Sequence, residues 1–188
     1  MLGLALAIVP PSTRAADNAA LGGIGGIDNG TLAGGDGTGT ARISLFSAEL
    51  SLVKQARDAG GTVLPDDSPV SPGQELWFVL FVDNPTDAPA IDVRITDLLD
   101  ETQFRYVPGS LEETLVPSGS GDAAIWAGAW TALTDAVGPP DDTASATDTG
   151  GLPEPDRITV GADPVQTNRA MDVPAHALRA VRFRARVN

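Results

Sequence analysis

Residues 75–109 read ELWFVLFVDNPTDAPAIDVRITDLLDETQFRYVPG, and this stretch decides the fold. Its first part, residues 76–82, is an apolar run rich in aromatic and β-branched types, which predicts a strand covered on both faces. Turn-forming residues follow at 84–89. Apolar Ile91, Val93 and Ile95 then alternate with polar residues, which predicts a strand with one buried and one solvent-exposed face. We expect the rest of the chain to pack around these strands.

The composition favours an all-β protein. The 188 residues suit one domain with an appendage, and 21 glycines and 15 prolines indicate many short strands joined by turns. The net charge of −13 argues against binding to nucleic-acid phosphates. The chain has no cysteine, which excludes disulfides and thiolate metal sites.

The same stretch carries a family resemblance. An aliphatic strand ending V-x-N is followed by a short turn, a V-x-V-x-D-x-L-like strand and an aromatic-V-x-G-S-like segment. The matching positions are Asn84, Asp97, Leu98, Gly109 and Ser110. The pattern resembles the repeat family known as domain of unknown function eleven, found in bacterial and archaeal surface proteins. This resemblance covers about residues 54–111 and returns more loosely at 173–187. It implies an immunoglobulin-like antiparallel β-sandwich on a cell surface, and it implies no catalytic residue.

The motif residues also have structural roles that follow from their chemistry. Asn84 is expected to hydrogen-bond backbone groups two residues on and so hold its turn. Asp97 is expected to cap the amide of Leu99 or Asp100 at the end of its strand. Together with Gly109, these residues are interpreted as turn residues and not as ligands.

The N-terminal part of the chain, residues 1–40, differs in composition from the rest. Residues 2–9 are apolar and small residues follow, so 1–16 is interpreted either as a secretory-signal remnant or as an apolar segment that packs as a strand. The apolar run is too short for a membrane span, which needs about 20 residues. Residues 17–40 form a glycine-rich arm, which is either a flexible linker or a strand that lies in a groove on a neighbouring subunit. The arm's candidate contact residues are Leu21, Ile24, Ile27 and Leu32.

The remaining residues, 41–188, are assigned to the β-sandwich domain. Residues 41–54 are strand-like, but apolar residues move from odd positions (Ile43, Leu45) to even positions (Leu50, Leu52). Such a change of parity predicts a bulge or a strand that crosses between two sheets, as strands shared between subunits do. Ile43 and Leu45 are therefore added to the candidate subunit contacts.

The last strand-like segment, residues 178–187, carries a stripe of arginines. Arg182, Arg184 and Arg186 alternate with apolar residues, which predicts a half-buried strand. In so acidic a chain these arginines are expected to pair with carboxylates, either across the sheet or on a neighbouring subunit. They are the last of the candidate subunit contacts.

Residues 115–156 allow two interpretations. Trp126, Trp130, Leu133 and Val137 have helical spacing, but Gly128 and nearby threonines make a pair of short strands an equal alternative. The two tryptophans would serve as a sugar-stacking platform or, as the simpler interpretation, as a core plug under a long loop.

The residues needed for catalysis are sparse. His176 is the single histidine, and no G-x-S-x-G motif accompanies it, so we expect no enzyme. No cofactor is expected either. Acidic clusters at 66–67, 97–101 and 141–142 offer oxygen ligands for calcium, although they lack EF-hand spacing.

Three functions are consistent with these features, in decreasing order of support. The first is a secreted structural protein of an extracellular filament or surface layer, which assembles with itself head-to-tail by donating a strand of its arm to the next subunit. The alternative is a monomeric, secreted, adhesin-like module that binds carbohydrate or protein through Trp126 and Trp130. An enzyme that uses His176 is third.

Overall fold

The computed structural model describes the backbone of four strands within residues 18–43, and then residues 49–137, 142–163 and 168–188. The chain divides into an N-terminal unit and a C-terminal unit, with the boundary between Ser47 and Ala48. The apolar residues 1–16 and two predicted contact residues, Ile24 and Leu45, lie outside the described part.

The N-terminal unit contains paired strands. β1 (Asn18–Gly23) pairs antiparallel with β4 (Thr38–Ile43), and β2 (Ile27–Asp28) pairs with β3 (Thr31–Leu32). The predicted contact residues Leu21, Ile27, Leu32 and Ile43 lie on these strands. The described strands therefore satisfy backbone hydrogen bonds among themselves, and the docking of such a strand on a neighbouring subunit stays a prediction.

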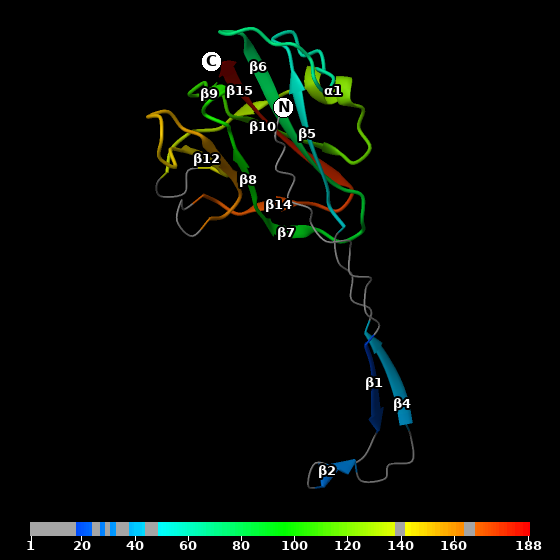
Figure 1. Ribbon diagram of the computed structural model, residues 1–188. Helices are drawn as coiled ribbons and strands as arrows, with labels where there is room; N and C mark the ends of the chain where they lie inside the picture. Colours follow the sequence, from blue (N-terminus) through cyan, green and yellow to red (C-terminus); the bar gives the residue numbers. More distant parts are fainter. Residues whose placement is uncertain are drawn as a thin grey trace. The chain divides into compact units, whose positions relative to one another are not determined.

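The C-terminal unit is all-β with one short helix, as the composition predicts. Its elements are β5 (Ser51–Arg57), β6 (Glu75–Asn84), β7 (Ala90–Val93), β8 (Ile95–Leu98), β9 (Phe104–Tyr106), β10 (Glu112–Pro117), α1 (Asp122–Ala127), β11 (Thr131–Ala132), β12 (Ala144–Thr147), β13 (Arg157–Val160), β14 (Met171–Val173) and β15 (Ala177–Val187). The large sheet has the order β11-β10-β15-β6-β5, with β9 also pairing with β15. Two smaller antiparallel sheets, β12-β13-β8 and β14-β7, complete the unit (Figure 1).

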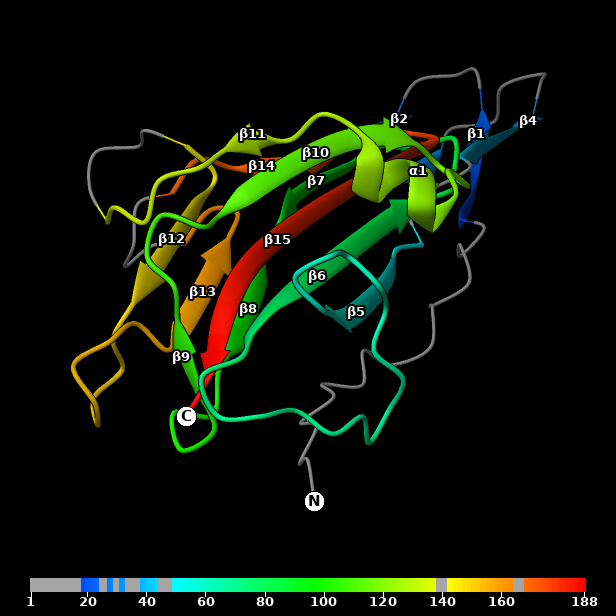
Figure 2. The ribbon, with the colours of Figure 1, turned by 90° about the horizontal axis from the view of Figure 1, so that it is seen from above.

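The main core lies between the large sheet and the two smaller ones. In Figure 2, β15 and β6 cross in front of β7 and β8. Phe78 and Leu80 of β6 and Phe183 of β15 pack against Ile158 of β13 and Met171 of β14. The other face of β6 is covered as well, because Val79 and Phe81 pack under α1 with Leu178. The prediction of a strand buried on both faces is confirmed for β6.

The strand-like character expected over residues 41–54 is confirmed at the two ends that the structure describes. These two ends belong to different strands, since β4 pairs with β1 whereas β5 pairs with β6. The change in apolar parity falls on residues outside the described part, so the expected bulge or crossing stays a prediction.

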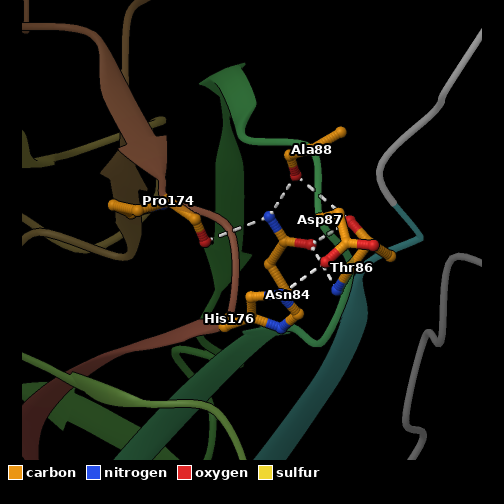
Figure 3. A network of polar contacts seen from close by, with 6 residues as sticks. All are labelled: Asn84, Thr86, Asp87, Ala88, Pro174 and His176. Atoms are coloured by element: carbon orange, nitrogen blue, oxygen red, sulfur yellow. Dashed lines mark hydrogen bonds and ion pairs between the residues drawn. The ribbon is translucent and has the colours of Figure 1, made fainter.

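Asn84 holds the turn after β6 through a set of polar contacts (Figure 3). Its side chain is fully buried, and its Oδ1 accepts hydrogen bonds from the backbone and hydroxyl of Thr86, at 3.2 and 2.7 Å. Its Nδ2 donates to the carbonyls of Ala88, Val173 and Pro174. The contact with Thr86 is the one expected from sequence, and the contacts with β14 additionally tie this turn to the opposite layer.

The capping role expected of Asp97 is wrong. Its Oδ1 accepts a hydrogen bond from Nζ of Lys54 at 2.7 Å, and the amide of Leu99 donates to the carbonyl of Asp156 instead. The local cap belongs to Asp100, whose Oδ1 accepts from the amide of Thr102. Gly109 lies in a turn with φ of +70°, a conformation that favours glycine.

Candidate functional site

The large sheet ends at β5, whose outward side we call the open edge. β5 pairs along one side with β6, and at its C-terminal end the carbonyl of Ala56 accepts a hydrogen bond from the amide of Leu64 on the other side. Backbone groups in a strand alternate in direction, so those of Leu52 and Lys54 point outward like those of Ala56. Within the described part of the chain no backbone group pairs with them.

The open edge is also apolar. Leu50, Leu52 and Val53 are 37%, 53% and 46% exposed, respectively. Proteins ordinarily protect such an edge with free charges, prolines or a covering segment. The one charged residue on β5 before Arg57 is Lys54, and its ammonium is held by Asp97. This edge therefore has the features of a strand-accepting surface.

A groove runs along the face of the sheet between β5 and α1, and we call it the edge groove. Its volume is about 210 Å³, and its apolar lining comes from Val53, Phe81, Ile125 and Leu178. Its polar lining comes from Ser51, Gln55, Asp83, Ser120 and Asp122. Within the described residues, Oδ1 of Asp83 is buried and has no hydrogen-bond partner.

A tryptophan–arginine cluster (Trp77, Trp126, Trp130 and Arg182) covers the same face farther from the edge. The guanidinium carbon of Arg182 lies 4.6, 4.7 and 4.1 Å from the ring centroids of Trp77, Trp126 and Trp130. These are cation–π distances, and Nε of Arg182 also donates to Glu112 at 2.6 Å. All three tryptophans of the chain thus surround one cation.

The structure around this cluster bears on both questions left open for residues 115–156, namely their secondary structure and the role of the two tryptophans. α1 is a helix of six residues that ends at Ala127, so the helix expected from the spacing of Trp126, Trp130, Leu133 and Val137 is wrong. Residues 131–132 form the short strand β11 instead. The indole of Trp130 donates to the carbonyl of Trp126, and both rings pack on the small apolar cluster under α1. The structure supports a packing role for these indoles, and their use as a sugar platform stays a prediction.

One close approach fixes α1 in place. Gly61 has φ of +89°, and a Cβ atom there would lie 1.9 Å from Nε1 of Trp126. Beside it, the buried guanidinium of Arg57 donates to the carbonyl of Gly61 and to Gln55, and pairs with Asp122 of α1. Only glycine allows this contact between the β5–β6 connection and the helix.

The other arginines of β15 are paired within the sheet. Arg184 and Arg186 donate to the carboxylate of Glu75 on β6, at 3.2 and 2.7 Å. The hydrogen bond from Arg186, followed by the positive charge of Arg184, lowers the pKa of Glu75. The prediction that the stripe pairs with carboxylates across the sheet is confirmed, and a role for Arg182, Arg184 and Arg186 in subunit contact stays a prediction.

The structure places the candidate catalytic histidine and the candidate metal ligands in turns and loops. His176 lies in an exposed turn with φ of +54°, and its Nε2 is 2.7 Å from Oδ1 of Asp87. In the described residues, one acidic group could hold a metal ion, formed by Glu101, Asp148 and Asp156. Their oxygens accept hydrogen bonds from loop groups, including the amides of residues 149, 150 and 152. Calcium binding stays a prediction.

The open edge and Asp83 were not singled out from sequence. Exposure of Leu52 follows from its strand being last in the sheet, which depends on pairing between distant residues. Trp77 lies within the apolar run of residues 76–82, and nothing local in the sequence reveals that it faces Arg182. The change of parity before β5 was the one local signal near this site.

Comparisons with known proteins do not assign this chain to a family. A scan against family models, a search of curated proteins and a search of solved structures each find no match. The resemblance to the surface-protein repeat rests on the motif residues alone. In the described part of the chain, no helix is long and apolar enough to cross a membrane.

Proposed function

We propose that this protein is a secreted structural subunit of an extracellular filament or surface layer. A strand of the N-terminal arm of one copy adds to the open edge of β5 in the next copy. The C-terminal unit is proposed to be an immunoglobulin-like sandwich, which is a common scaffold for such subunits. The observation that carries the proposal is the exposed, apolar and unprotected edge of β5.

Two further properties support head-to-tail assembly. The described segments of the arm already have strand conformation, so little backbone ordering is needed when one of them docks. Donor and acceptor are different surfaces of the chain, and a contact between unlike surfaces propagates into an open polymer unless it closes on itself.

The proposal is tested on the full chain at β5. In Leu52→Pro the outward N–H is removed, whereas the hydrogen bonds from β5 to β6 use the alternate residues. Leu52→Ala is the matched control, since it removes the same side chain and keeps the N–H. We expect Leu52→Pro to remain monomeric by light scattering and negative-stain microscopy under conditions in which the control forms polymers.

A second variant tests the proposal independently, in case the proline variant does not fold. Deleting residues 16–47 removes the arm and keeps the compact unit Ala48–Asn188 behind residues 1–15. We expect this variant to be a soluble monomer with an unchanged β-type circular dichroism spectrum. Filaments formed by this deletion variant would show that the arm is not the donor and would refute the proposal.

A further inference from the structure

We propose that the donated strand is β4 and that Asp83 of the acceptor recognises Arg42 of the incoming copy. This inference rests on the proposed function and specifies its donor, its register and its charge pair.

The acceptor side offers a carboxylate without a cation. Asp83 lies directly opposite Ser51 in the β5–β6 register and lines the edge groove. In the described part of the chain it makes no ion pair, and its Oδ1 is buried without a partner. Arg57, the other cation on the groove side of β5, lies at the far end of the strand opposite Trp77 and is engaged by Gly61, Gln55 and Asp122. A carboxylate partly removed from water gains most from a cation that arrives with a docking partner.

The donor side offers one matching cation. Arg42 is the single basic residue between positions 18 and 43, and it lies on β4. β4 pairs with β1 along one side, and no other described strand pairs with it. β1 carries no basic residue, so charge complementarity favours β4 as the strand that docks.

The two faces of the strands also match. In a strand added to β5, Arg42 would face one side of the sheet and Ala41 and Ile43 the other, because side chains alternate along a strand. Along β5, Ser51 and Val53 line the edge groove, and Leu52 is on the opposite face. A strand added with Arg42 on the groove side therefore places its apolar positions beside the exposed Leu52. The small side chain of Ser51 leaves room for a long side chain to reach Asp83.

Charge reversal in the full-length chain tests the pair. We expect Arg42→Asp and Asp83→Arg to lower the polymerisation rate about tenfold or more each, as for loss of a close interfacial charge pair. A chain that carries both reversals should regain most of the lost rate, since the pair is restored with opposite sense. Asp87→Arg is the control, because Asp87 is an exposed carboxylate outside the groove. Single reversals that polymerise like the control would overturn the assigned pair, and so would failure of the double reversal to recover.

A cross-linking experiment tests the same register independently of kinetics. The natural chain has no cysteine, so Arg42→Cys in one preparation and Ser51→Cys in another can be mixed and oxidised with copper phenanthroline. We expect a covalent heterodimer on a denaturing gel. Its absence, or an internal disulfide in a chain that carries both substitutions when diluted, would show that β4 does not reach the edge of a neighbour.

These outcomes separate the inference from the proposed function. If Leu52→Pro blocks polymerisation but neither charge reversal affects it, strand donation to β5 is supported and the donor is a strand other than β4. Polymers that tolerate Leu52→Pro would refute strand addition at β5 altogether.

Discussion

Two regions of the large sheet differ in how their polar and apolar groups are satisfied. One is the outer face, which carries Glu75 and the tryptophan–arginine cluster, and the other is the open edge of β5 with the adjoining edge groove. On the outer face, Glu75 receives two arginines and Arg182 lies among three indoles. At the edge, two outward backbone positions, an exposed leucine and the carboxylate of Asp83 have no partner within the described residues. The charges of Glu75 and Arg182 are thus matched within the fold, whereas the unpaired groups beside β5 mark a surface that another chain can complete.

The largest effect is expected from a core residue that both regions depend on. Leu111 is fully buried in the main core, so Leu111→Ala should lower the free energy of unfolding by about 3 kcal/mol through lost burial and a residual cavity. Urea denaturation measures this change. Leu115→Ala, at a position 48% exposed, is the matched control. Equal losses in the two variants would mean that the core is not where the structure places it.

A smaller but clear effect is expected from the tryptophan–arginine cluster. Arg182→Ala removes three cation–π contacts and leaves Glu112 without its partner, which should cost about 2 kcal/mol. The control is Arg186→Ala, whose side chain is 57% exposed and should cost less than about 0.5 kcal/mol. Quenching of tryptophan fluorescence should change in the first variant alone. A stability loss in the control as large as that in Arg182→Ala would contradict the comparison.

The ion pairs of the outer face predict a dependence on pH. The folded-state pKa of Glu75 is lowered from its ordinary value of 4.5, so the stability it contributes is complete above about pH 4.5. That contribution is lost as pH falls through the lower folded-state pKa. The stability difference between the natural chain and Glu75→Gln should therefore shrink between pH 6 and pH 3, as measured by thermal unfolding. A constant difference across this range would exclude the linkage.

The smallest effect on folding is expected at the open edge. Leu52→Ala in the 48–188 unit should change the free energy of unfolding by less than about 0.5 kcal/mol, because the side chain is already half exposed. A substitution of the same type thus costs little at position 52 and much at position 111. A loss above about 2 kcal/mol would show that Leu52 belongs to the core of the single subunit. The open edge would then need no second chain to cover it.

Local patterns in the sequence predicted much of the scaffold. The apolar run predicted β6, and the arginine alternation predicted β15. The turn held by Asn84 could also be predicted from the sequence, because the contact between Asn84 and Thr86 spans only two residues. In each case the decisive interactions lie within one strand or turn. The single half-buried strand expected over residues 91–95 is wrong, because Arg94 separates β7 from β8, the two strands join different sheets, and Ile91 is 69% exposed.

The rest depended on contacts between distant residues. Asp97 meets Lys54 from 43 residues away, and this contact replaced the local cap that its position suggested. Trp126 and Trp130 meet Arg182 from a strand more than 50 residues on, and no period in the sequence reveals that pairing. The open edge is likewise a property of strand order, which the hydrophobic pattern of β5 alone does not encode.

The central position of β15 has a consequence for how the domain forms. β15 pairs with β6 over ten positions and also with β10 and β9, so residues 177–187 join strands that precede them by up to about 110 residues. Before these residues emerge from a ribosome, β6 has β5 as its one partner among the described strands, and the large sheet cannot close. Such non-local pairing slows folding and leaves apolar strands exposed during synthesis. We therefore expect the chain to reach its native state only after synthesis of the domain ends, a delay during which chaperone binding would keep the unfinished strands apart.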